Sequence, residues 1–285
     1  MLRFEIAMNK TLLTFLFALL SPAALAQTII VSTLTQAPQI DGQDSDWDKV
    51  PAHNIMLAAF TQNSGLQSRE LIIKAGQFQR QVFFYFQWPD NTENITHKTY
   101  VWNEEKQRYK KGTDLEDRLA MQFEISGEYS TDWPNANDFV VDTWHWKAAR
   151  SNPLGLAHDK IATLSSKKLL RAASIPSPDG NNRYVFRESD EGTRLYKTLR
   201  YVKKEQDLMP KYELFPNPRG SIADVKAKGI WRNGSWHLEL SRQLDTGHSD
   251  DARFVSNQTV RGGIAVFDAS PDENHIISET LVFQF

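Results

Sequence analysis

Residues 117–150, DRLAMQFEISGEYSTDWPNANDFVVDTWHWKAAR, decide the fold of this chain. The stretch opens with strict alternation, because Leu119, Met121 and Phe123 fall on one face of an extended chain and the residues between them fall on the other. A loop rich in Trp, Asn and Pro follows. The chain then returns through residues 142–150, which are dense in indole, imidazole and cationic side chains. This pattern predicts two neighbouring strands of an antiparallel sheet.

Working outward, the flanking segments also read as short strands joined by turns. Residues 71–76 and 81–90 predict a β-hairpin, and Asn233-Gly234 is typical of a type I′ turn between two strands. Residues 97–114 are polar and charged and predict a solvated hairpin or loop. The number of short strands indicates an all-β fold, an antiparallel β-sandwich of the immunoglobulin or carbohydrate-binding-module kind.

The pattern weakens over residues 151–228, where several prolines interrupt it. We interpret this region as a long, loop-rich insertion in the sandwich. It is expected to hold one short helix near residues 162–172 and a strand near residues 194–202.

The amino terminus has the features of a secretory signal peptide. Arg3 and Lys10 precede an apolar run at residues 12–20, and Ala24-Leu25-Ala26 is a small-x-small cleavage site. Residues 1–26 are therefore predicted to be removed, leaving residues 27–285 as one domain without a transmembrane segment. The chain contains no cysteine, so the expected periplasmic or secreted protein is stabilised by its core and not by disulfides.

The bulk composition argues against several classes of function. The formal net charge is −2, from 33 Lys and Arg against 35 Asp and Glu, which does not suggest a nucleic-acid partner. Nucleophile-elbow, zinc-protease and P-loop motifs are absent from the sequence. Hydrolytic chemistry therefore has little support.

Three side chains could ligate a metal: Met121, His145 and His275. Met121 would otherwise be a core thioether, His145 a backbone-bonded imidazole and His275 an exposed loop residue. Lys147 is a poorer ligand, because lowering its pKa from about 10.4 to near 7 costs about 4–5 kcal/mol, whereas histidine is already mostly neutral there.

Several stretches, taken in order, resemble the haem-binding domain of the ethylbenzene dehydrogenase gamma subunit and related dimethyl-sulfoxide-reductase-type electron-transfer subunits. The matching pieces are IDGQDSDW (40–47), FYFQW (84–88), DRLAMQF (117–123), DTWHWKAAR (142–150), WHLELSRQL (236–244), GGIAVFD (262–268) and ENHIIS (273–278).

The resemblance implies one non-covalent b-type haem between the two sheets, acting as an electron relay. The family's second ligand region follows the AVFD-like strand and matches at His275. The loop that carries the first ligand in relatives holds no Met, Cys or His here, so Met121, or alternatively His145, would supply it.

The other expected haem contacts come from residues 142–150. Trp144 and Trp146 would wall the pocket, and Lys147 and Arg150 would pair with the haem propionates. The implied partner is a redox protein, such as a molybdenum oxidoreductase or a membrane cytochrome.

A second interpretation is a haem-free sandwich that binds carbohydrate through Trp102, Tyr109 and Trp133 in polar loops. A third is a subunit that only docks, through residues 151–228.

Overall fold

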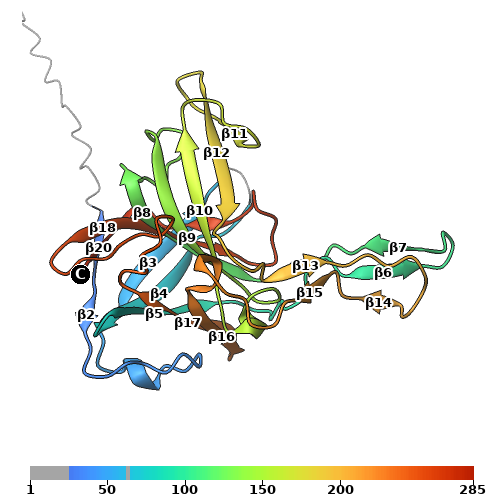
Figure 1. The fold of residues 1–285 in the computed structure, drawn as a ribbon, viewed down its shortest axis with the longest axis horizontal. Helices are drawn as coiled ribbons and strands as arrows, with labels where there is room; N and C mark the ends of the chain where they lie inside the picture. Colours follow the sequence, from blue (N-terminus) through green and yellow to red (C-terminus); the bar gives the residue numbers. More distant parts are fainter. Residues whose placement is uncertain (1–25, 62–64) are drawn as a thin grey trace, which may run out of the picture.

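The computed structural model describes residues 26–61 and 65–285, so all but the last residue of the expected signal peptide lies outside the described part (Figure 1). Two β-layers pack together. The first layer contains β11 (Ala173–Pro176), β12 (Asn182–Ser189), β10 (His158–Ser165), β9 (Phe139–Lys147), β8 (Arg118–Gly127), β18 (Thr259–Phe267), β20 (Leu281–Gln284) and β1 (Gln27–Ile30). The second contains β3 (His53–Ala59), β4 (Arg69–Phe78), β5 (Gln81–Pro89), β17 (Ser235–Gln243) and β16 (Lys226–Arg232).

The two layers are joined at one edge. The short strand β19 (Ile276–Ile277) pairs antiparallel with both β18 and β3, and β2 (Ser32–Thr33) pairs parallel with β4. In the described part of the chain, short 3₁₀ turns lie in the connections: η1 (Ser45–Trp47), η2 (Asn152–Leu154) and η3 (Ser221–Ala223). The expected all-β, mainly antiparallel sandwich is therefore confirmed.

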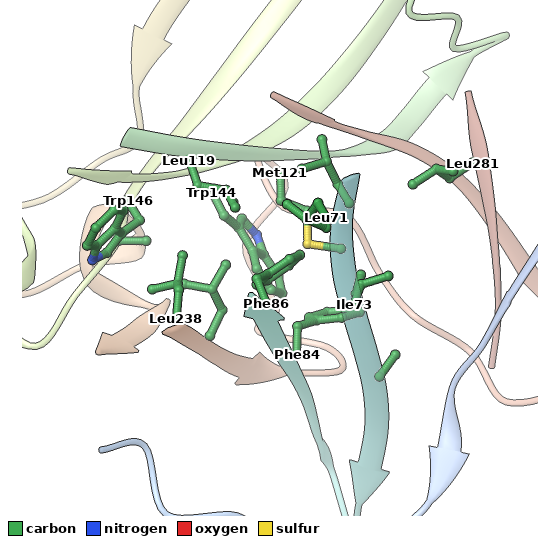
Figure 2. Close-up of a cluster of buried hydrophobic side chains, with 14 of the residues drawn as sticks. Leu71, Ile73, Phe84, Phe86, Leu119, Met121, Trp144, Trp146, Leu238 and Leu281 are labelled. Atoms are coloured by element: carbon green, nitrogen blue, oxygen red, sulfur yellow. The ribbon is translucent and has the colours of Figure 1, made fainter. Parts of the chain in front are cut away.

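One hydrophobic core fills the space between the layers. Figure 2 shows Leu119, Met121 and Trp144 from the first layer facing Phe84 and Phe86 of the second. Phe84 makes edge-to-face contact with Trp144, at 5.8 Å between ring centroids. Burying a side chain of this size contributes about 1.5–3 kcal/mol, so the aromatic residues of β5 and β9 are a major source of stability.

Strand β5 buries aromatic side chains on both of its faces. Phe84, Phe86 and Trp88 belong to the main core, whereas Phe83 and Tyr85 belong to a second cluster around Trp47. The Trp47 indole N–H donates to Glu239 Oε1 at 2.7 Å, which fixes the segment that covers this face. β5 pairs with β4 on one side and with β17 on the other, so it is a central strand that is covered on both faces.

The turn between β16 and β17 has the expected geometry. Asn233 and Gly234 both have positive φ, 52° and 73°, as a type I′ hairpin requires. The register around it pairs Trp231 with Trp236. The hairpin of β4 and β5 is likewise formed as predicted.

Residues 151–228 contribute more regular structure than the sequence suggested. β10 pairs along the edge of β9, and β12 and β11 extend the first layer further. The helix expected near residues 162–172 is wrong, because Ala162 and Leu164 lie within β10 with their side chains buried against the sheet. The apolar alternation in β10 is short, and the polar residues of the strand obscure it.

A small arm projects from the sandwich (Figure 1). β6 (Tyr100–Asn103) and β7 (Arg108–Lys111) form the predicted hairpin of residues 97–114, and β14 (Leu208–Met209) pairs with β6. β13 (Tyr196–Thr198) and β15 (Tyr212–Leu214) pair nearby as a two-stranded sheet. Among the described residues, none of the helices is long and apolar enough to cross a bilayer.

Candidate ligand-binding pocket

A pocket of about 510 Å³ lies on the outer face of the first layer, away from the second layer. Its size falls within the range of small-molecule and cofactor sites. The cleft expected between the two sheets is instead filled by the hydrophobic core, so the cavity was predicted on the inner face of the first layer and lies on its outer face. The reason is the alternation of β8: Leu119 and Met121 face inward, and Ala120 and Gln122 face the pocket.

The floor of the pocket is lined by small side chains. Ala120 of β8, Ala162 of β10 and both Gly263 and Ala265 of β18 line it. A Cβ added at Gly263 would lie 2.5 Å from the Tyr129 hydroxyl, so glycine allows the 129–133 loop to close over this end. These small residues leave room over this part of the sheet.

His275 stands at the mouth of the pocket between two aromatic rings. Its imidazole stacks on Phe60 and on Phe267, with centroid distances of 4.7 and 4.6 Å. Nδ1 lies 3.0 Å from the Asp272 carbonyl oxygen, which can only accept, so Nδ1 carries the proton and Nε2 keeps its lone pair. Burial lowers the pKa of His275 to about 4, which leaves a neutral imidazole able to ligate a metal.

His145 lines the same pocket from β9. Its ring stacks on Phe267 at 5.8 Å, and its buried Nε2 has no hydrogen-bond partner among the described residues. Burial, reinforced by the charge of Lys147, holds the pKa of His145 well below its usual value. The structure therefore brings His145 and His275, two of the predicted ligands, to one cavity.

Two cations also line the pocket, Lys160 of β10 and Arg187 of β12. Within the described ranges, neither side chain forms an ion pair, although Arg187 lies over the Trp133 ring at 5.2 Å. Burial and the charge of Arg187 lower the pKa of Lys160 to about 8. The sequence analysis missed both residues. The signal that could have found Lys160 is its position opposite the pocket-lining Thr143, on the same face of the sheet.

Met121, Trp144 and Trp146 do not reach the pocket. All three are fully buried in the core, where Trp144 packs against Phe123 and Trp146 against Trp236 at centroid distances of 5.0 and 4.9 Å. They alternate with the pocket-facing residues of the same strands, so they project from the opposite face of the sheet. Met121 and His275 are therefore not brought together.

Lys147 and Arg150 also lie outside the pocket lining. Lys147 Nζ donates to His158 Nδ1 at 2.7 Å and is only 2% exposed. Arg150 forms an ion pair with Glu116 and lies over the Tyr212 ring at 5.1 Å. Both cations are occupied by groups of the protein itself, which leaves them unsuited to the propionate role expected for them.

The three aromatic residues of the carbohydrate interpretation are separated in space. Trp102 and Tyr109 contact each other on the arm, at 5.0 Å between ring centroids. Trp133 lines the pocket and is 9% exposed. They do not form a common stacking platform.

A family model described as ethylbenzene dehydrogenase matches residues 44–276. The chain belongs to the ethylbenzene dehydrogenase family. The resemblance seen in the separate sequence stretches is thereby confirmed, and it spans most of the ethylbenzene dehydrogenase-type domain, including β8, β9 and β18.

Solved structures similar to this ethylbenzene dehydrogenase family member are β-proteins of low sequence identity. One is a candidate carbohydrate-binding protein from Bacteroides uniformis, with 7% identity, a TM-score of 0.40, and coverage of 90% of this chain and 91% of that one. Two further structures are of a family 9 carbohydrate-binding module from Caldicellulosiruptor kristjanssonii, one in complex with glucose and one with cellotriose, and each is 11% identical to this chain. Their TM-scores are 0.39 and 0.37, and the matches cover 90% of this chain and 85% and 84% of those chains, respectively. At these values they support no functional argument. A comparison with curated proteins finds no match.

Proposed function

We propose that this protein is a non-covalent b-type haem-binding domain that passes electrons to or from a partner oxidoreductase. The observation that carries the proposal is His275, a neutral imidazole held between two rings with Nε2 free, at the mouth of an apolar pocket. When bound, haem would supply one-electron redox chemistry, and the protein would supply the ligand and the apolar surroundings that set its potential.

The pocket lining supports the proposal through its size and chemistry. The small residues Ala120, Ala162 and Gly263 leave room over the sheet, and Trp133 also lines the cavity. His275 is the proposed axial ligand, and His145 is a second imidazole nitrogen in the same cavity. The hydrogen bond to the Asp272 carbonyl would orient the His275 ring and increase its basicity, as such bonds do for metal-ligating histidines.

Lys160 and Arg187 are proposed to take the role first assigned to Lys147 and Arg150. Neither forms an ion pair among the described residues, because Asp272, which also lines the pocket with Glu273, pairs with Arg118. Two like charges beside an apolar cavity favour the approach of an additional anionic group. The two propionates of haem are such groups, and guanidinium and ammonium donors bind carboxylates with charge-assisted hydrogen bonds.

We further propose that the domain is not itself catalytic and works in the periplasm, after removal of residues 1–26. The partner would be a redox protein, for which the projecting arm and the pocket mouth offer exposed surfaces. Membership of the ethylbenzene dehydrogenase family supports a role as a subunit of an oxidoreductase complex.

The proposal is tested by titrating the purified protein with ferric haem and recording visible absorption. The expected result is saturable binding of one haem per chain with a sharpened Soret band. His248→Ala is a matched control, since this half-exposed imidazole pairs with Asp224 outside the pocket, and it should bind haem like the wild type. Only weak, non-saturating absorbance changes in the wild-type protein would contradict the proposal.

A further inference from the structure

Three carboxylates meet where strands of both layers end, in a cluster separate from the pocket lining. Asp90 directly follows β5, Asp117 directly precedes β8, and Asp268 directly follows β18. One oxygen from each lies within 4.8 Å of the other two. Because calcium binds oxygen at about 2.3–2.6 Å, a single ion placed among them could contact all three.

The cluster carries more negative charge than the protein neutralises. Asp90 and Asp117 are only 2% and 1% exposed, and neither has an ion-pair partner among the described residues. Asp268 pairs with Arg69 at 2.8 Å. One guanidinium beside three carboxylates leaves two negative charges, which one divalent cation would balance.

Asp90, a member of this cluster, carries a buried acceptor without a partner. Asp90 Oδ1 accepts the Thr92 N–H at 3.1 Å, whereas Oδ2 is buried, has no hydrogen bond within the described ranges and is costly to leave without a partner.

Asp117 is held firmly in place for such a role. Its Oδ2 accepts the Asn94 N–H at 2.8 Å and the Trp236 indole N–H at 3.0 Å, and its Oδ1 accepts the Ala269 N–H at 2.9 Å. The carboxylate is therefore oriented before any ion arrives, which lowers the cost of binding.

We propose that Asp90, Asp117 and Asp268 bind a hard divalent cation of the calcium class. The donors are all carboxylate oxygens without imidazole or thiolate, a set that suits calcium better than zinc or copper. The ion would tie β5 of the second layer to β8 and β18 of the first. It would also anchor the base of the 268–275 segment that carries His275.

A second acidic cluster provides a comparison. Asp142, Asp159 and Asp251 lie close together, but the buried Arg242 guanidinium is 2.5 Å from Asp142 and 3.0 Å from Asp251. A cation of the protein already occupies that cluster, so it is not the proposed site.

The test is calorimetric titration of the chelator-treated, purified full chain with calcium chloride, together with thermal unfolding. The wild type is expected to bind one calcium ion per chain and to unfold at a higher temperature when it is bound. Asp90→Asn keeps the Oδ1 acceptor for Thr92 and removes the charge. It should bind calcium at least tenfold more weakly, and Asp268→Asn, a change at a partly exposed side chain, should do the same.

Asp251→Asn is the control at the other cluster and should leave calcium affinity unchanged. The proposal is overturned if the wild type shows neither binding heat nor thermal stabilisation. It is also overturned if the Asp268→Asn variant binds calcium as tightly as the wild type, or if only Asp251→Asn weakens binding. These readouts need no haem, so they are independent of the proposed function.

Discussion

His275 and Phe267 stack with ring centroids 4.6 Å apart and planes 27° from parallel, and the same Phe267 ring contacts His145. One phenyl ring thus positions both imidazoles of the pocket. It is itself covered by Arg118, whose guanidinium carbon lies 4.2 Å from the ring centroid. The orientation of the proposed iron ligand therefore depends on packing around Phe267 as well as on the hydrogen bond to Asp272.

We predict that Phe267→Leu weakens haem binding while the domain stays folded. Leucine keeps apolar bulk but removes the aromatic stacking, and such ring pairs contribute about 0.5–1.5 kcal/mol each. The dissociation constant, measured by absorbance titration, should rise about two- to tenfold. The control is Phe215→Leu, because Phe215 directly follows β15 and does not line the pocket. This variant should bind haem as the wild type does.

Lys160→Met and Arg187→Met should each weaken haem binding about tenfold, because each removes a charge-assisted contact to a propionate. Lys160→Met should not lower the melting temperature of the haem-free protein, since it relieves repulsion from Arg187. Haem dimethyl ester lacks the propionate charges and should bind the wild type and both variants equally. If a variant lost the same affinity for haem and for haem dimethyl ester, the replaced residue would have a purely structural role.

Met121→Leu should leave the haem spectrum and affinity unchanged. Met121 is fully buried in the core, in register with Trp144 and Ile264, and a volume-conserving replacement there costs less than about 1.5 kcal/mol. The measurement is absorbance titration beside chemical denaturation. A changed low-spin spectrum in this variant would show that sulfur reaches the iron after all.

Asp190→Asn should make stability less dependent on pH. Asp190 is buried, and neither of its carboxylate oxygens has a hydrogen bond among the described residues. Burial, with repulsion from Asp250 and Asp142, raises its pKa from 3.8 to about 8. The folded protein therefore holds a proton that the unfolded chain releases, so this group's contribution to stability declines as pH rises from about 4 to 8.

The Asp190→Asn variant is expected to be about 1–3 kcal/mol more stable than the wild type at pH 8 and nearly equal to it at pH 4. Urea denaturation at several pH values measures this. Asp207→Asn, an exposed residue of the arm, serves as the control. If Asp190→Asn instead destabilised the protein at pH 8, the wild-type carboxylate would have to be ionised and paired.

The fold was predictable because it depends on local patterns. Alternation in residues 117–125 and 81–88 and the Asn233-Gly234 turn each specify strands or hairpins without long-range information. β10 escaped detection since polar residues, among them the pocket-lining Lys160, break its apolar pattern.

The site was only half predictable, for a related reason. Alternation says that Met121 and Ala120 face opposite sides of a sheet, but it does not say which side holds the cavity. His145 and His275 both line the pocket; the sequence singled out His145 because it lies between two Trp, and His275 because it matches the second ligand region of the family. Met121 and Trp144 were misplaced because the ligand was assumed to lie between the layers.

The central claim, that His275 binds the iron of a haem held on the outer face of the first layer, is tested most directly by His275→Ala with free imidazole added back. The account predicts that this variant loses the low-spin visible spectrum of the wild type and regains it on addition of imidazole. A low-spin spectrum in His275→Ala without imidazole, identical to that of the wild type, would contradict it.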